Sequence, residues 1–575
     1  MDKLKKIFLA FSDKERKIFL AAAALVIVSG LVLIIVVVRG ATKAMPTRGG
    51  EYIEGFIGQP SAVNPVSAAS DVDKSLVRLV FAKLEDLASQ IELDKSGLFW
   101  KVRLKEGLVW TDGKPLTSDD VVFTIQKIQD ESAQSPLISK WRGVGAERMS
   151  ELEVQLRAPG TAPILEIQRA KAQGESLNFS TEWTSALEHE IKNLYLLPKH
   201  IFNDVPPINW RLSDYNLSPV GSGFYRFKNY DKDRRGFITR YELEINPDYP
   251  GEAALIENIS FKFYQDKENL VAAFNRGMIG GAGGLDPQEV EKIKRPFEKL
   301  SFPSPNYYAV FINQSKNTIL KDIAVRKAMS LSTPREALVK EVLGGDGQVV
   351  SGPVVQGVGS DSLVAQDKDE AIRVLEASGW NLSDGSGTDN SLPGVRQKTI
   401  NKTKVNLEIN LTVPEIPFLT ATADKLKATW EGIGFKVNIS KVPEGDALDN
   451  IIKNRDYEML LYGNFLGDDL DLTPFWRSTE RFFPGLNLSL YSNKAVDALL
   501  DKLGQNPTQQ DRESTLAQLQ GLITQDYPAI FLYSPNYVLV AENDLKGIQG
   551  KLVTDPADRF KESYKWNLKT VRVLK

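Results

Sequence analysis

The segment 104–123 most narrowly limits the fold, because it predicts a strand, a tight turn and a capped helix in immediate succession. Asp112 and Gly113 form a dipeptide typical of hairpin turns, where glycine tolerates a positive φ. Thr117, followed three residues later by Asp120, matches a capping box that opens a helix. A strand that feeds directly into a helix indicates a mixed α/β fold.

The rest of the chain supports this interpretation. Short strand-like runs and amphipathic helical runs alternate without a repeat, with strands expected at 52–57, 99–104 and 435–440 and helices at 119–129 and 423–433. At 575 residues, the chain is long enough to fold into more than one lobe. We therefore expect several lobes of α/β structure.

Composition excludes several function classes. The 71 basic and 74 acidic residues leave a net charge of -3, too weak a field to favour nucleic acid as a partner. With no cysteine, the chain has no thiolate metal site, cysteine nucleophile, disulfide or lipid-modified cysteine.

Catalytic motifs are also missing from the sequence. The two histidines, His189 and His200, lie in no His-Glu-x-x-His spacing, and the chain has no Gly-x-Ser-x-Gly elbow. We predict that the chain is not an enzyme and needs no metal or cofactor. A hydrolytic site made only of Asp and Glu stays open as an alternative, because carboxylates are abundant.

Residues 18–38 form an uncharged apolar run, about the length that crosses a bilayer as one helix. A cleaved signal peptide would have a shorter apolar region and a better small-x-small site. We therefore predict an uncleaved anchor, with 1–17 in the cytoplasm and 39–50 as a short flexible stalk. The orientation follows from the bias of basic residues, with Lys3, Lys5, Lys6, Lys14, Arg16 and Lys17 before the span against Arg39, Lys43 and Arg48 after it.

Together with further motifs, the opening segment carries a family resemblance. Its Trp110, Asp112, Gly113 and Pro115 resemble a W-x-D-G-x-P signature of the extracytoplasmic solute-binding proteins of peptide and nickel ABC importers, bacterial family 5. Other motifs resembling this family follow in the family's order, at 196–201, 219–225, 246–249, 274–279, 325–336 and 375–380. The resemblance covers nearly all of the chain after the apolar run.

This resemblance implies a two-lobed periplasmic-binding-protein-like fold of type II with an extra subdomain, in which ligand lies between the lobes. The implied lobe I comprises 51–86, 195–300 and 530–575, the extra subdomain 87–194, and lobe II 301–529. Hinge motion would close the lobes around the ligand.

The resemblance also points to ligand-binding residues in an acidic segment. In the family, the first Asp of the corresponding loop binds the α-amino group of a peptide, a role that falls here on Asp468, with Asp471 as the second acid. The same segment contributes Gly463, Asn464, Phe465 and Trp476, and the strand around Tyr308 resembles one that lies near the cleft. Unpaired strand backbone would bind an extended peptide irrespective of its sequence.

The function implied is a membrane-anchored, single-pass extracytoplasmic receptor, periplasmic or at the cell surface. It would act as a monomer that captures short peptides and delivers them to the permease of an ABC transporter. Two alternatives stay open: the same fold binding oligosaccharide, nickel or haem, and an anchored interaction protein without a transport role.

Overall fold

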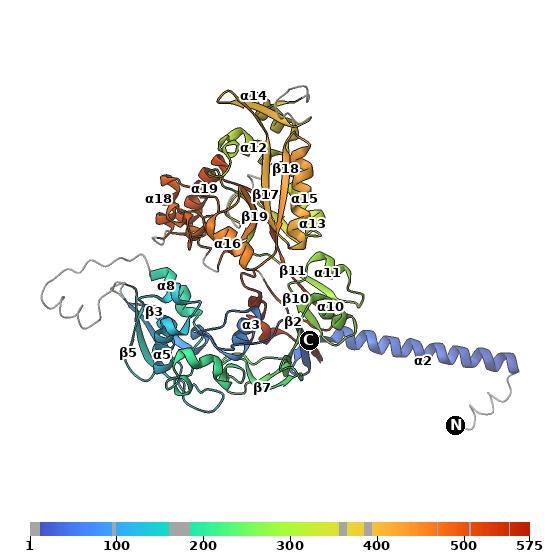
Figure 1. Cartoon of the computed structure of the whole chain (residues 1–575). Coiled ribbons are helices and arrows are strands. Elements are labelled where there is room, and N and C mark those ends of the chain that lie inside the picture. The colour runs from blue at the N-terminus through green and yellow to red at the C-terminus, as the bar shows by residue number, and fades with distance from the viewer. Residues whose placement is uncertain are drawn as a thin grey trace.

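The computed structural model describes residues 12–94, 99–159, 184–355, 365–383, 394–467, 470–504, 508–550 and 552–574. Figure 1 shows two bodies of mixed α/β structure and one long helix, α2, that extends away from both. We call the body built on the seven-stranded sheet the first lobe and the body built on the six-stranded sheet the second lobe. The expected two-lobed α/β fold is confirmed.

The first lobe is built on a sheet whose strand order is β11-β21-β10-β2-β9-β8-β7. Strand β2 is central, parallel to both neighbours, and its partners come from distant parts of the chain. The strands are β2 (Glu51–Ile57), β7 (Tyr225–Lys232), β8 (Ile238–Ile245), β9 (Asn258–Tyr264), β10 (Gly281–Gly283), β11 (Glu298–Phe302) and β21 (Tyr537–Ala541). The helices include α3 (Asp71–Val80), α4 (Leu84–Leu87), α9 (Lys199–Phe202), α10 (Lys267–Asn275) and α11 (Pro287–Glu291).

A second, antiparallel sheet of four strands shares the hydrophobic core of the first lobe. It comprises β3 (Ala88–Leu93), β4 (Phe99–Leu104), β6 (Glu153–Arg157) and β5 (Gly145–Arg148), with helices α5 (Ser118–Gln129), α6 (Ile138–Trp141) and α8 (Thr184–Lys192) nearby. Thr117 and Asp120 form the predicted capping box at the start of α5, and Gly113 has a φ of 81° in the predicted turn. These local predictions are confirmed.

The second lobe is built on a sheet whose strand order is β13-β20-β12-β19-β17-β18. Its strands are β12 (Tyr307–Ile312), β13 (Gly347–Val349), β17 (Glu408–Pro414), β18 (Lys436–Val442), β19 (Met459–Asn464) and β20 (Ala529–Pro535). One face packs on α12 (Ile323–Ser332), α13 (Arg335–Val342), α14 (Lys368–Ala377) and α15 (Pro417–Glu431). The other packs on α17 (Thr473–Trp476), α18 (Lys494–Gly504) and α19 (Gln509–Asp526). Helix α16 (Asp446–Asn454) and a small sheet of β14 (Asn381–Leu382), β15 (Arg396–Ile400) and β16 (Thr403–Asn406) complete it.

The chain crosses between the lobes at two adjacent points, after β11 and at Asn536. Hydrogen bonds join the two crossings, with Ser534 Oγ donating to the Ser304 carbonyl at 2.7 Å and Asn536 Nδ2 to Ser301 Oγ at 2.9 Å. The expected crossing points at 300/301 and 529/530 were wrong by a few residues, because each falls inside a strand. Strand β20 belongs to the second lobe because it pairs with β12, and the sequence of β20 alone does not reveal this pairing.

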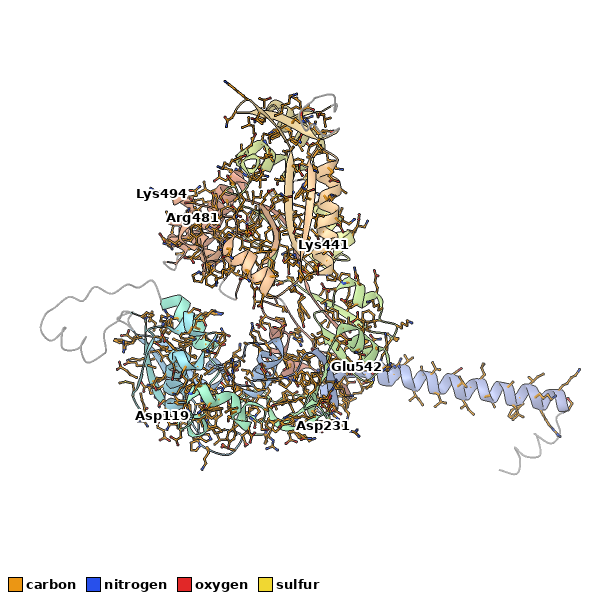
Figure 2. All side chains as sticks on the ribbon, viewed as in Figure 1. Asp119, Asp231, Lys441, Arg481, Lys494 and Glu542 are labelled. Carbon is orange, nitrogen blue, oxygen red and sulfur yellow. The ribbon has the colours of Figure 1, made fainter. Side chains whose placement is uncertain are left out.

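The apolar run forms helix α2 (Asp13–Ala41), whose side chains project on all sides without packing on either lobe (Figure 2). It is the one helix among the described residues that is long and apolar enough to span a membrane. The expected flexible stalk at 39–50 was wrong. Strand β1 (Thr42–Thr47) follows α2 at once and pairs antiparallel with β22 (Lys569–Leu574), a partner too distant in sequence for local patterns to reveal.

Candidate functional site

The predicted ligand-binding residues cluster around two paired strands of the second lobe. Strands β12 and β19 are antiparallel neighbours, and their register places Tyr308 opposite Gly463 and Tyr307 opposite Asn464. Because side chains alternate across a strand, these two pairs lie on opposite faces of the sheet. The predicted residues therefore divide into two groups.

The first group is an aromatic cluster beside Gly463. The ring of Tyr308 lies 5.2 Å from Phe418, 5.9 Å from Tyr533 and 6.1 Å from Phe465, measured between ring centroids. A Cβ at position 463 would lie only 2.8 Å from Tyr308 Cε1, so glycine lets this ring lie flat against the strand. Phe465 remains 59% exposed and supplies an apolar surface for a ligand.

The second group lies inside the core. Tyr307 Oη accepts hydrogen bonds from Asn464 Nδ2 at 2.7 Å and from Trp476 Nε1 at 3.0 Å, and all three side chains are buried. In this conformation Asn464 and Trp476 hold the end of β19 in place and are covered by protein. A direct contact between either side chain and a ligand stays a prediction.

The acidic loop follows β19. Asp468 lies outside the described residues. The carboxylate of Asp471 is exposed and accepts a hydrogen bond from the backbone N–H of Thr473 at 2.9 Å, at the start of α17. Asp471 thus lies on the surface, where one of its carboxylate oxygens caps the start of α17.

One edge of β19 is paired over only part of its length, and its residues are buried apart from the half-buried Tyr462. Strand β17 pairs with β19 at Met459 and Leu460 only, so within the described chain the edge from Leu461 to Asn464 has no strand partner on that side. The opposite edge is fully paired with β12. An open strand edge offers N–H and C=O groups to which an extended peptide can add as a further strand.

The aromatic cluster borders the junction between the lobes. A small cavity of about 50 Å³ is lined by Leu285, Asp286, Pro287, Leu343, Asp346, Phe418, Pro535, Asn536 and Val538, which come from both lobes. Burial raises the pKa of the Tyr308 hydroxyl, and the carboxylate of Asp286 in the first lobe adds to the effect. Lys299 and Asp346 form an ion pair of 3.0 Å across the same junction.

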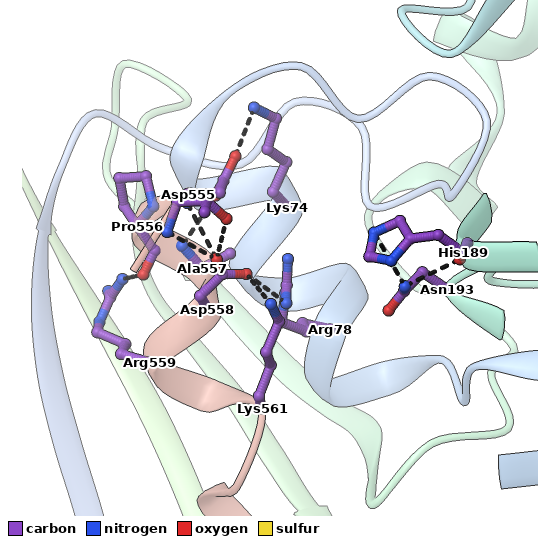
Figure 3. Close-up of polar contacts among 11 residues, drawn as sticks. Lys74, Arg78, His189, Asn193, Asp555, Pro556, Ala557, Asp558, Arg559 and Lys561 are labelled. Carbon is purple, nitrogen blue, oxygen red and sulfur yellow. Dashed lines mark hydrogen bonds and ion pairs between the residues drawn. The ribbon is translucent and has the colours of Figure 1, made fainter. Parts of the chain in front are cut away.

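A larger cavity lies elsewhere, within the first lobe, and measures about 800 Å³. None of the predicted site residues lines it. Figure 3 shows part of its wall, where the carboxylate of Asp558 binds both Arg78 and Lys561. Phe224, another lining residue, stacks on Tyr564 and lies at a tilt to the ring of Tyr249. The cavity is lined by both acidic and basic side chains.

Among the residues that the structure describes, no three or more His, Cys, Asp or Glu side chains are arranged to hold a metal ion. His200 Nε2 donates to the carboxylate of Asp112 at 2.8 Å, and His189 contacts Asn193, so each histidine has a local partner.

The family follows from comparison with known proteins. Residues 84–481 match the model of the bacterial extracellular solute-binding proteins, family 5. The chain belongs to this family. Members are binding components of transport and not enzymes, so the prediction that the chain has no enzymatic activity is confirmed. The resemblance of the motifs to this family is confirmed as well.

This family 5 solute-binding protein has relatives that match most of its length. It is 26% identical over 528 residues to the oligopeptide-binding protein AppA of Bacillus subtilis, covering 87% of this chain and 89% of AppA. It is 23% identical over 471 residues to the probable D,D-dipeptide-binding periplasmic protein DdpA of Escherichia coli, covering 80% of this chain and 81% of DdpA.

Solved structures show the same fold. The substrate-binding protein CtaP of Listeria monocytogenes superposes with a TM-score of 0.72 at 24% identity, covering 91% of this solute-binding protein and all of CtaP. NikZ of Campylobacter jejuni, solved with Ni(L-His), superposes with a TM-score of 0.67 at 21% identity, covering 90% of this chain and 99% of NikZ. The chain therefore shares its architecture with both solved proteins.

Sequence patterns did not reveal every residue of the site. Phe418, Tyr533 and Asp286 come close to Tyr308 only through the fold, and no motif marked them. The one local signal was Pro417, because proline in the first turn indicates where a helix begins, and it placed Phe418 at the start of α15.

Proposed function

We propose that this protein is a membrane-anchored receptor that captures peptides between its two lobes and delivers them to an ABC importer. Its relatives AppA and DdpA, named for oligopeptides and D,D-dipeptides, support peptide as the cargo. The observation that carries the proposal is the edge of β19 that β17 leaves unpaired after Leu460. It lies beside the aromatic cluster, whose Phe465 is exposed, at the junction of the lobes.

This arrangement suits a ligand with a constant backbone and variable side chains. The edge from Leu461 to Asn464 would pair with the peptide main chain, and the rings of Tyr308 and Phe465 would contact its side chains. Asp468 and Asp471 would bind the α-ammonium group through charge-assisted hydrogen bonds. Affinity would come mainly from the backbone, so selectivity among sequences would be modest.

Anchoring by α2 and an extracytoplasmic position for both lobes complete the proposal. The apolar helix and the excess of basic residues before it support this orientation. The permease and ATPase subunits would be separate chains. Closure about the two crossings at 303–306 and Asn536 would bring the first lobe against the bound peptide.

The test is a thermal shift followed by calorimetry on the full chain in detergent micelles. A ligand that binds only the folded state must raise the melting temperature. We expect stabilisation by a mixed peptide pool, lost in Asp468→Asn and weakened in Asp471→Asn. Asp456→Asn, an exposed acid of the same lobe that pairs with Lys316, is the matched control.

Nickel-histidine, haem and oligosaccharides form the other arms of this experiment. Stabilisation by one of them alone would keep the fold and overturn the cargo. No response to any pool would overturn the receptor role and favour an anchored interaction protein.

A further inference from the structure

The junction between α2 and the first lobe contains no linker. Helix α2 ends at Ala41, and Thr42 is already extended and begins β1. All residues of β1 pair with β22, from Thr42 opposite Leu574 to Thr47 opposite Lys569. The anchor is therefore joined to the lobe by a two-stranded ribbon, which we call the β1–β22 ribbon.

The far end of this ribbon is firmly attached to the first lobe. The N–H of Gly49 donates to the Leu255 carbonyl at 2.8 Å, and Asn567 exchanges backbone hydrogen bonds of 2.9 Å with Lys546. Both strands thus leave the lobe at fixed points. The position of α2 determines where the ribbon's other end, at Thr42 and Leu574, can lie.

Helix dimensions place that end at the membrane surface. The apolar run 18–38 is about 31 Å long at a rise of ~1.5 Å per residue, which matches a hydrocarbon core of about 30 Å. Thr42 then lies about 5–6 Å beyond the core, within a headgroup layer of about 5–7 Å per leaflet. Since Leu574 pairs with Thr42, it must lie at the same depth.

The composition of the ribbon fits such a position. Leu574 is 79% exposed, and Met45 and Val571, which face each other, are exposed as well. Neither strand contains an acidic residue, whereas Lys43, Lys569 and Arg572 are basic and Arg39 precedes them. Arg572 Nη1 donates to Thr42 Oγ1 at 3.1 Å, which fixes this cation beside the helix end.

We propose that the membrane end of the β1–β22 ribbon lies in the headgroup layer of an anionic bilayer, where Arg39, Lys43 and Arg572 bind lipid phosphates and Leu574 reaches the acyl boundary. Apolar side chains flanked by cations, with no acid, are typical of segments at this interface. The ribbon then holds the first lobe at a fixed height and orientation above the membrane. This inference rests on the anchoring part of the proposed function and is independent of the cargo.

The absence of cysteine from the chain permits a direct test. Leu574→Cys and Lys494→Cys each create a single labelling site for an environment-sensitive fluorophore. Lys494 lies on the second lobe, away from α2 (Figure 2). The full-length variants are reconstituted, without a permease, in vesicles of phosphatidylcholine alone and of equal parts phosphatidylcholine and phosphatidylglycerol, with and without brominated lipid.

We expect the label at position 574 to shift to shorter emission wavelength and to be quenched by brominated lipid, while the label at 494 reports water. A long Gly-Ser insertion between Ala41 and Thr42 should abolish the shift at 574, because a flexible linker frees the ribbon from the surface. Lys43→Gln combined with Arg572→Gln should weaken the dependence of the shift at 574 on phosphatidylglycerol, because Arg39 alone then remains to bind phosphate. Lys441→Gln combined with Lys494→Gln, on the second lobe, should leave it unchanged.

The outcomes separate the two proposals. If the chain does not float with vesicles, both the anchoring and the ribbon's position are overturned. If the chain floats but the label at 574 has the same emission wavelength and quenching as the label at 494, only the ribbon's position is overturned. Shielding that occurs solely after a permease is added would likewise overturn it, because the partner would then be protein. Peptide binding is measured by calorimetry and does not affect this result.

Discussion

Glu54 of β2 and Arg559 of the short helical turn at Pro556–Phe560 form a buried ion pair in the first lobe. Glu54 Oε1 lies 2.8 Å from Arg559 Nε and 2.7 Å from its Nη2, and Tyr52 donates to the other carboxylate oxygen at 3.0 Å. The rings of Phe56, Tyr537 and Phe560 surround the guanidinium. Burial disfavours the charge on Arg559, but Glu54 outweighs this and raises its pKa.

This pair predicts a large loss of stability when either partner is removed. Glu54→Gln or Arg559→Met should each lower the free energy of unfolding by about 3–5 kcal/mol, since an uncompensated buried charge remains. Urea unfolding of the first lobe measures it. Arg235→Gln, which removes an exposed pair with Asp233, should cost no more than about 1 kcal/mol. If the buried-pair variants lost no more unfolding free energy than Arg235→Gln, the stabilising role of the Glu54–Arg559 pair would be contradicted.

Asp558 predicts a dependence of stability on pH. Burial opposes its ionisation, but Arg78 and Lys561 outweigh this and lower its pKa to about 2. A lowered pKa stabilises the fold above the unfolded value of about 4, and this contribution of roughly 2–3 kcal/mol is lost as the pH falls toward 2. The difference in unfolding free energy between wild type and Asp558→Asn should therefore shrink over this range.

Lys561→Gln supplies the control for that experiment. Removing one of the two cations raises the pKa of Asp558 toward its ordinary value, so the loss should begin at a higher pH. A difference between wild type and Asp558→Asn that is constant down to about pH 2 would show that the carboxylate is not selectively stabilised in the folded state.

Phe465 predicts a specific loss of peptide affinity. Phe465→Ala removes an exposed ring beside Tyr308 and should weaken peptide binding by about 1–3 kcal/mol while changing stability little. Calorimetry with a peptide that stabilises the wild type measures the effect. Phe482→Ala is the matched control, because Phe482 is 66% exposed on the same lobe but lies outside the candidate site. Equal affinity in both variants would remove Phe465 from the site.

The hydroxyl of Tyr307 should contribute both to stability and to peptide affinity. Tyr307→Phe leaves the buried donors of Asn464 and Trp476 without an acceptor, which should cost about 1–3 kcal/mol of stability. Because these contacts hold the end of β19, peptide affinity should fall as well. Tyr215→Phe, at an exposed tyrosine of the first lobe, should change neither quantity.

Gly223 packs so closely on α3 that a larger residue there should destabilise the first lobe. A Cβ there would lie 2.5 Å from the Leu79 carbonyl oxygen, so Gly223→Ala should destabilise the first lobe by about 1–3 kcal/mol. Gly504→Ala has open space around it and should be neutral or stabilising. Thermal unfolding of the two variants gives the comparison. The motif at 219–225 thus needs glycine for its approach to α3, since the φ of Gly223 is not positive.

The sequence by itself determined the local elements and the family. The turn at Gly113, the capping box of Thr117 and Asp120 and the apolar run of α2 depend on residues that are close in the chain, so local chemistry specifies them. The motifs in their order were enough to predict the two-lobed fold and to point to β12 and β19.

Only the tertiary structure decided which distant segments pair and which side chains face a ligand. Register turned Asn464 inward to Tyr307 and left Phe465 exposed, because neighbours in a strand point to opposite faces. Strand β20 pairs with β12 in the second lobe, and β1 pairs with β22, which lies near the other end of the chain. Such pairings depend on which edges remain free after the cores have formed, and that information is not contained in any one segment.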